Sequence, residues 1–464
     1  ADSHGGSLVA TDLGGWFGDN QQFGYRVNAA YEDIHPYVEH ADGKRLFGSL
    51  ALDWKISDRS KLEFDLESQR QKQRSVPGYQ LLGGETIPTG VEWDRLLGYQ
   101  SWSKPVTNES LNTSLKYSYQ INDNWSSNLS ASQSRVVVDD YSAFAYTFDT
   151  DGNYDIYDFR SPDDSYLTNQ FKTGLNGAFN TGAWQHSLSL ELSHAYKRHT
   201  QYESTYSMVN VGAGNIYNDP ITHTPNDRDL GNHYKSLDSQ QTALNVLDQI
   251  EFNDAWSVLL GGKLLHLNES AYATDGNSIR DTDFNRFLPQ LALMYQPWQN
   301  THLYASYAKG ISDGSQAPWS AYGNPDKGIV GNAFETLAPR RSTQYELGLK
   351  QQWQELLFTA ALFDLTQDHQ YTNLDNYYVT DGEQHNLGLE LGLQGRVAEN
   401  LDMTSTLALT RSRLEDIQVD AYKGHQTQNV PTVRFASHVS YQMPQVEGLR
   451  LLAGMQYSSS KYAN

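Results

Sequence analysis

The stretch Leu387-Gly388-Leu389-Glu390-Leu391-Gly392-Leu393-Gln394 places an apolar side chain at every second position. Successive side chains of a β-strand point to opposite faces, so this period of two predicts a strand with one apolar and one polar or small face. The same alternation recurs in Leu62-Glu63-Phe64-Asp65-Leu66-Glu67 and in Leu188-Ser189-Leu190-Glu191-Leu192-Ser193. We find no long stretch with the period of an amphipathic helix. The pattern therefore predicts an all-β protein with long, two-faced strands.

Composition excludes several other classes of protein. The mean hydropathy is −0.63, and no window approaches the run of about 20 apolar residues that a membrane helix needs. Residues 1–20 lack the basic start and apolar run of a signal peptide. The chain has no Cys, which excludes a disulfide scaffold and thiolate metal sites. Its net charge of −21 argues against nucleic acid as a partner.

Alternation and turn residues together predict eighteen strands. The predicted ranges are 7–17, 23–33, 43–55, 61–72, 110–121, 125–138, 168–180, 185–198, 240–252, 256–268, 284–296, 301–310, 342–352, 355–371, 377–396, 401–413, 432–443 and 449–459.

The connections between these strands alternate in length. Short turns such as Gly18-Asp19-Asn20 and Ala398-Glu399-Asn400 carry the residues that tight turns need. Between them come long connections near 73–109, 139–167, 199–239, 311–341 and 414–431. Short turns on one side and long loops on the other are the layout of a transmembrane antiparallel β-barrel of the bacterial outer membrane.

The tryptophans support the same interpretation independently. Indole rings prefer the membrane interface, where both an apolar body and a polar N–H are satisfied. A soluble β-sandwich or propeller would give no reason for tryptophans to gather beside short turns. Seven of the ten nevertheless do so: Trp16, Trp54, Trp125, Trp184, Trp256, Trp298 and Trp353.

Strand parity predicts that the barrel is incomplete. Bacterial outer-membrane barrels have an even number of strands, with both ends of the chain in the periplasm. The first predicted strand runs into a short turn, and the last one leaves a short turn. We therefore expect one strand before residue 1 and an odd number of strands after residue 464.

Several short motifs appear in a fixed order along the second half of the chain. They are Tyr304-Ala305-Ser306-Tyr307-Ala308-Lys309-Gly310, Leu337-Ala338-Pro339, Ser342-Thr343-Gln344-Tyr345-Glu346-Leu347-Gly348-Leu349-Lys350, Thr359-Ala360-Ala361-Leu362-Phe363-Asp364, Asp381-Gly382-Glu383-Gln384, Gly388-Leu389-Glu390-Leu391, Asn429-Val430-Pro431 and Gly454-Met455-Gln456-Tyr457.

In order and spacing, these motifs resemble the barrel of TonB-dependent ferric-siderophore receptors. Two further motifs, Tyr25-Arg26-Val27-Asn28-Ala29-Ala30-Tyr31-Glu32 and Ser75-Val76-Pro77-Gly78, extend the resemblance over most of the chain. The resemblance implies a complete barrel of 22 strands, whose wide lumen is closed by a plug. Residues 1–464 would then be the barrel domain alone, incomplete and without the N-terminal plug and the last strands. The chain also lacks the cysteine pair that relatives often carry in an outer loop.

The resemblance further implies what the protein does. It would import a ferric siderophore across the bacterial outer membrane, with energy supplied by TonB and its inner-membrane motor acting through the plug. It would catalyse no reaction and hold no cofactor, and the iron chelate would be its cargo. Its other partners would be outer-membrane lipid and lipopolysaccharide.

Ligand contacts are expected on the outer loops, because binding residues concentrate on connections held by a rigid scaffold. A ferric siderophore is large, polar and often aromatic, which suits aromatic faces and polar donors. Each candidate could instead serve loop packing or an outer aromatic girdle. The candidates are Tyr79, Gln80, Trp93, Arg95, Tyr99, Trp102, Phe144, Tyr146, Tyr202, Tyr206, Trp319 and Tyr322.

The acidic stretch from Asp149 to Asp158 has the oxygen spacing of a Ca²⁺ loop but lacks the Glu that closes one. We therefore favour a solvated acidic turn.

Other functions also stay open. Haem, cobalamin or another metal chelate could replace the siderophore, and His223 and His233 are the first haem candidates. A passive porin would show steady conductance. An outer-membrane enzyme would need a Ser/His/Asp group at one rim.

Overall fold

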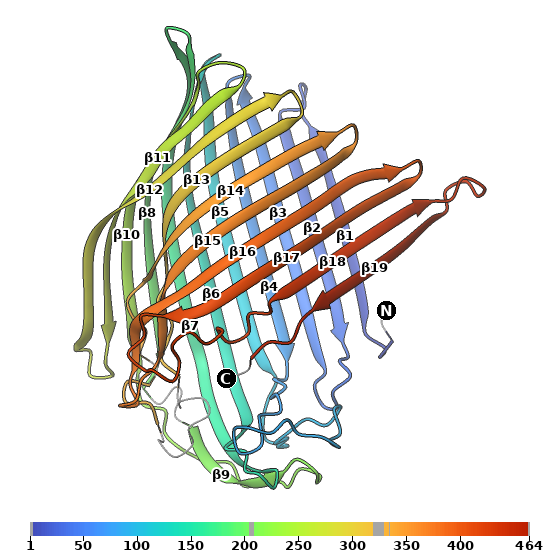
Figure 1. The fold of residues 1–464 in the computed structure, drawn as a ribbon. Helices are drawn as coiled ribbons and strands as arrows, with labels where there is room; N and C mark the ends of the chain where they lie inside the picture. Colours follow the sequence, from blue (N-terminus) through green and yellow to red (C-terminus); the bar gives the residue numbers. More distant parts are fainter. Residues whose placement is uncertain (1–2, 204–207, 319–328, 334, 463–464) are drawn as a thin grey trace.

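The computed structural model describes residues 3–203, 208–318, 329–333 and 335–462, which form one curved antiparallel sheet (Figure 1). The sheet has 19 strands within this described part of the chain. They are β1 Ser7–Phe17, β2 Phe23–Ile34, β3 Gly43–Ser57, β4 Ser60–Gln73, β5 Val106–Asn122, β6 Trp125–Tyr146, β7 Asn153–Thr181, β8 Trp184–Tyr202, β9 Met208–Asn215, β10 His233–Glu251, β11 Trp256–Tyr272, β12 Ser278–Trp298, β13 Thr301–Ser312, β14 Arg340–Trp353, β15 Leu356–Thr372, β16 Tyr378–Ala398, β17 Leu401–Glu415, β18 Val433–Gln442 and β19 Arg450–Ser458.

Eighteen of these strands form the wall in chain order, and β9 is the exception. Strand β8 pairs directly with β10, whereas β9 pairs with the outer part of β7. Short turns join the strands at the upper end in Figure 1, and the long connections lie at the lower end. None of the described residues forms a helix long and apolar enough to cross a membrane.

The all-β prediction is confirmed, and each of the eighteen predicted ranges overlaps one wall strand. The predicted connection 139–167 is wrong, because β6 and β7 continue outward as a paired hairpin that turns at residues 147–152. The alternation of apolar and polar residues is interrupted here by a register shift between Val138 and Asp140. Pro162 interrupts it as well, and a strand tolerates a proline at such an irregularity. Strand β9 was not predicted.

The two faces of the wall are chemically distinct. One cavity is lined by charged side chains from β4, β8 and β11: Asp65, Glu67, Lys197 and Lys263. Only the concave side of the sheet can form a cavity that spans these strands, so the charged side chains point to that side. Alternation then puts the apolar side chains of the same strands, such as Leu66, on the convex side. The wall thus encloses a polar lumen and turns its apolar face outward.

The predicted tryptophan girdle is confirmed in position. All seven of the tryptophans predicted beside short turns lie at strand ends next to those turns. Six of them are among the exposed large side chains: Trp16, Trp54, Trp184, Trp256, Trp298 and Trp353.

Candidate functional site

The inner wall carries a cavity of about 590 Å³ that spans β4 to β11. Its charged lining is balanced between acids and lysines, and Ser, Thr, Asn and Gln side chains supply most of the rest. Such a surface can bind a polar body through many neutral hydrogen bonds without strong selection for one sign of charge. The charged members are Asp65, Glu67, Lys172, Glu191, Lys197 and Lys263.

Beyond the wall, a layer of loops packs on the outer hairpin of β6 and β7. A buried cluster joins residues of the 74–105 loop, including Leu82 and Leu97, to Tyr154 and Ile156 of β7. The Tyr154 hydroxyl accepts a hydrogen bond from the Gly98 backbone N–H at 3.3 Å. The loop layer is therefore held by its own small core.

Three predicted ligand residues lie together in this loop layer. Trp93 is 59% exposed, and its ring meets the Tyr79 ring edge-on at 5.2 Å. The Tyr79 hydroxyl donates to the Glu92 carbonyl at 2.8 Å, and partial burial raises the Tyr79 pKa. Arg95 is nearly buried and donates to the Ile216 carbonyl at 3.1 Å. Trp93 and Tyr79 thus offer an accessible aromatic surface, and Arg95 ties the loop that carries them to the backbone of Ile216.

Two other predicted residues of the same loop are used in packing. The Tyr99 ring stacks on His40 at 4.3 Å. The Trp102 indole N–H donates to the His223 carbonyl at 2.9 Å, and its ring packs on Tyr141. Gln80 is half-buried in this loop.

Three further candidates lie on strands and not in loops as predicted. Phe144 and Tyr146 lie on β6, on the hairpin face opposite the one that packs on the loop layer. Tyr202 ends β8 and contacts His233 at 5.0 Å. Tyr206, Trp319 and Tyr322 fall outside the described residues.

The solvated acidic turn is only partly confirmed. Asp149 lies at the hairpin tip and accepts hydrogen bonds from the backbone of Asp151 and Asn153. Asp158, in contrast, is fully buried and ion-paired with Arg160 at 3.2 Å. Tyr154 and Ile156 alternate with acidic neighbours, and this was the signal in the sequence that could have identified the strand.

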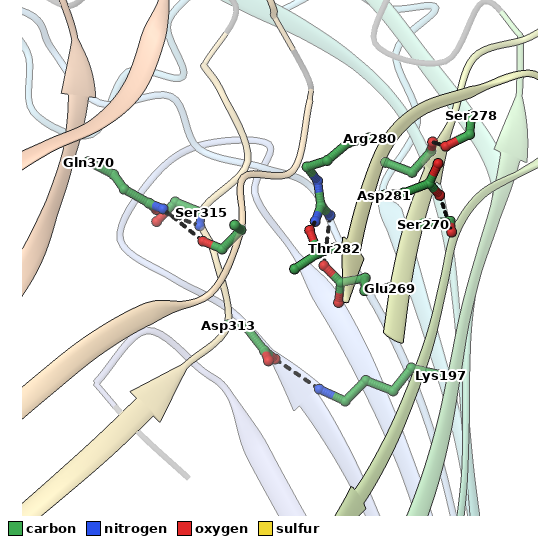
Figure 2. A network of polar contacts seen from close by, with 12 residues as sticks. Lys197, Glu269, Ser270, Ser278, Arg280, Asp281, Thr282, Asp313, Ser315 and Gln370 are labelled. Atoms are coloured by element: carbon green, nitrogen blue, oxygen red, sulfur yellow. Dashed lines mark hydrogen bonds and ion pairs between the residues drawn. The ribbon is translucent and has the colours of Figure 1, made fainter. Parts of the chain in front are cut away.

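A strap, residues 313–317, follows the end of β13 and crosses the inner side of the wall (Figure 2). Ile311 packs on the apolar cluster of Ala243, Leu265 and Leu288. Lys197 of β8 pairs with Asp313 at 2.9 Å.

The far end of the strap is tied to β15. The Ser315 N–H donates to the Gln370 amide oxygen at 2.8 Å. The strap therefore connects β8 to β15 at the outer end of the lumen. Spacing in the sequence gave no sign of these contacts, because their partners are far apart along the chain.

A Ser-His-Asp group is present near the outer rim. His199 lies between the Ser236 hydroxyl, at 2.7 Å from its Nδ1, and Asp164 on its Nε2. The imidazole is stacked on Tyr166 at 4.2 Å, and Ser236 also donates to the His199 carbonyl at 3.4 Å. These contacts join β7, β8 and β10 to one another at the outer end of the wall.

Both haem candidates form hydrogen bonds to backbone carbonyls, His223 in a loop and His233 at the start of β10. His223 Nε2 lies 3.0 Å from the Ala213 carbonyl, and His233 Nε2 lies 3.3 Å from that of Asp163.

Comparison with known proteins decides the family. Residues 51–464 match the model of the family described as TonB dependent receptor-like, beta-barrel. The chain belongs to this family. Members of the TonB-dependent receptor family are receptors of the bacterial outer membrane and not enzymes.

Curated relatives of this TonB-dependent receptor barrel are named for metal chelates. The ferrichrome receptor FcuA of Yersinia enterocolitica is 25% identical over an aligned length of 467 residues, and the alignment covers 98% of this chain and 60% of the relative. The metal-pseudopaline receptor CntO of Pseudomonas aeruginosa is 26% identical over 430 residues, 88% of this chain and 57% of the relative. The chain thus spans about three fifths of the length of these proteins.

Solved structures of siderophore receptors share the fold. The ferric preacinetobactin receptor BauA of Acinetobacter baumannii superposes with a TM-score of 0.80 at 20% identity, covering 99% of this chain and 68% of that one. The ferripyoverdine receptor of Pseudomonas aeruginosa also gives 0.80, at 14% identity, with 98% and 60% covered.

Proposed function

We propose that this barrel forms the wall of an outer-membrane receptor that imports a ferric siderophore, with energy supplied through TonB. Relatives named for ferrichrome and metal-pseudopaline support a metal chelate as cargo. TonB would act through a plug domain, and the described residues form barrel wall and loops. Residues 1–464 are thus proposed to be a barrel domain that works together with a plug.

The observation that carries the choice of ligand is the accessible aromatic pair of Trp93 and Tyr79. The pair lies on the outer loop layer, at the end of a lumen whose wall is polar. Aromatic faces bind the organic part of a chelate, and nearby amides and hydroxyls pair with its oxygens. A ligand held here would reach the polar lumen after the plug moves.

The residues predicted in the sequence fall into two proposed roles. Trp93, Tyr79, Phe144 and Tyr146 present half-exposed or exposed rings and are proposed to touch the ligand. Gln80, Arg95, Tyr99, Trp102 and Tyr202 are proposed to position these rings or the loops that carry them. Tyr206, Trp319 and Tyr322 lie outside the described residues and stay proposed ligand contacts.

The test is a binding screen of the full-length receptor, including its plug, against ferric catecholate, hydroxamate and mixed siderophores. Quenching of intrinsic tryptophan fluorescence would report binding. We expect one ferric chelate to bind tightly and the Trp93→Ala variant to bind it about tenfold or more weakly, since one buried aromatic contact contributes on this order.

Trp298→Ala is the matched control, because Trp298 is exposed at the opposite end of the wall. It should bind the chelate like the wild type. Failure of every ferric chelate, with tight binding of haem, cobalamin or metal-pseudopaline, would overturn the siderophore proposal and retain the transporter. Steady single-channel conductance in planar bilayers would instead indicate a passive porin.

A further inference from the structure

The outward face of the wall changes from apolar to basic at a defined height. The outward positions of β3 read, toward the outside, Trp54, Leu52, Leu50, Gly48, Leu46 and Lys44. On β6, Arg135 lies ten residues beyond Trp125 on the same face. A strand rising about 3.3 Å per residue and tilted by about 40° gains about 25 Å of height over ten residues, which equals the height of the apolar band. Lys44 and Arg135 thus stand at its outer boundary.

Four cations gather at this boundary on β3, β4 and β6, and we call them the basic patch: Lys44, Arg70, Lys72 and Arg135. All four side chains are exposed. Arg70 pairs with Glu109 at 2.8 Å. Among the described residues, no acidic side chain forms an ion pair with Lys44, Lys72 or Arg135.

The strand register makes this arrangement costly without an anion. Lys44 and Lys72 are direct partners in the β3–β4 ladder. Like charges directly opposite each other destabilise a sheet. Asp33 faces Lys44 from β2, but its carboxylate pairs with His35 at 3.3 Å.

An excess of basic residues does not explain the patch either. The chain has 34 Lys and Arg against 55 Asp and Glu. Lys44, Lys72 and Arg135 have no ion-pair partner among the described residues of this acidic protein, which indicates an anionic partner from outside the chain.

We propose that the basic patch binds the phosphate groups of lipopolysaccharide in the outer leaflet. The patch lies on the lipid side, where the acyl chains of the membrane end and its phosphates begin. Arg binds phosphate through paired N–H groups and Lys binds it as a point charge. A phosphate between Lys44 and Lys72 would convert a repulsive pair into two attractive contacts. The proposal depends on the outer-membrane location and is independent of the imported ligand.

The test measures thermal unfolding of the detergent-solubilised protein with increasing amounts of three probes. These are purified lipopolysaccharide, the same lipopolysaccharide after removal of its phosphates, and phosphatidylglycerol. We expect only intact lipopolysaccharide to raise the unfolding temperature of the wild type. The double variant Lys44→Gln/Lys72→Gln should lose most of that rise and need at least ten times more lipopolysaccharide for the same effect.

The matched control is Arg59→Gln/Lys423→Gln, which removes the same charge from a short turn and an outer loop. It should respond like the wild type. Without lipopolysaccharide, the Lys44→Gln/Lys72→Gln variant should unfold at the same or a higher temperature than the wild type, because the repulsion is gone. An unchanged response of this variant to lipopolysaccharide overturns the proposal, and so does an equal rise with dephosphorylated lipopolysaccharide or with phosphatidylglycerol.

Discussion

Asp158 and Arg160 lie two residues apart on β7 and form an ion pair of 3.2 Å, although the Asp158 side chain is fully buried. The same carboxylate accepts a hydrogen bond from the Asn226 backbone N–H at 2.8 Å and lies 3.5 Å from Arg228. One buried carboxylate therefore ties the outer hairpin to the segment that follows β9.

Replacing this carboxylate should loosen the loop layer. Asp158→Asn leaves two nearly buried arginines without their counter-charge, a change that costs about 3–5 kcal/mol. We expect limited proteolysis to cut residues 216–232 much faster in the variant, with the wall intact. Asp151→Asn, at the exposed hairpin tip, should be cut like the wild type. Equal cutting of Asp158→Asn and wild type would contradict the prediction.

The strap should be displaced by a single methyl group. A Cβ at Gly314 would overlap the Leu337 carbonyl oxygen. In Gly314→Ala, we expect the Ser315 and Leu337 amide hydrogens to exchange roughly tenfold faster or more, because local opening becomes easier. Hydrogen exchange with mass spectrometry would measure this. Gly78→Ala is the control, since nothing lies within 4 Å of a Cβ there; equal exchange in both variants would rule the effect out.

The Ser236-His199-Asp164 group should stabilise the wall without catalysis. We expect no hydrolysis of p-nitrophenyl esters by the purified protein above the uncatalysed rate. Ser236→Ala should lower the free energy of unfolding by about 1 kcal/mol, the usual contribution of one hydrogen bond. Ester turnover that disappears in Ser236→Ala would contradict this assignment.

The loop between β2 and β3 should respond to pH. Hydrogen bonds that the His35 imidazole donates to the carboxylates of Asp33 and, to a smaller extent, Asp42 raise the pKa of His35 above its ordinary value of 6.5. The stabilisation is therefore fully present below pH 6.5 and is lost as the pH rises through the higher folded pKa. Relative to the intrinsic, base-catalysed exchange rate, the protection of residues 35–42 against hydrogen exchange should fall over that rise in the wild type but not in His35→Gln. His302→Gln, far from this loop, should behave like the wild type.

Alternation predicted the wall well because lipid and lumen impose different chemistry on its two faces. The predicted range 43–55 compares with β3 at Gly43–Ser57, where Leu46, Leu50 and Leu52 face outward. Outside the membrane the two faces of a strand no longer meet different surroundings, so the alternation weakens. Strand β7 was therefore predicted only from residue 168 but begins at Asn153.

The loop contacts were less predictable for a different reason. Trp93 and Tyr79 belong to one loop, and the sequence proposed both as ligand contacts without predicting that their rings meet. Lys197 and Asp313 are 116 residues apart, so no local sequence pattern predicts their ion pair. Contacts of this kind depend on how the wall brings its strand ends together.

The direct pairing of β8 with β10 separates what must stay constant from what can vary. Strands β8 and β10 remain hydrogen-bonded to each other although an excursion that contains β9 separates them along the chain. A lineage could lengthen, shorten or replace this excursion without shifting the register of a single wall strand. Specificity for a new ligand could thus evolve by changes in this inserted segment, while the membrane-embedded wall is inherited unchanged.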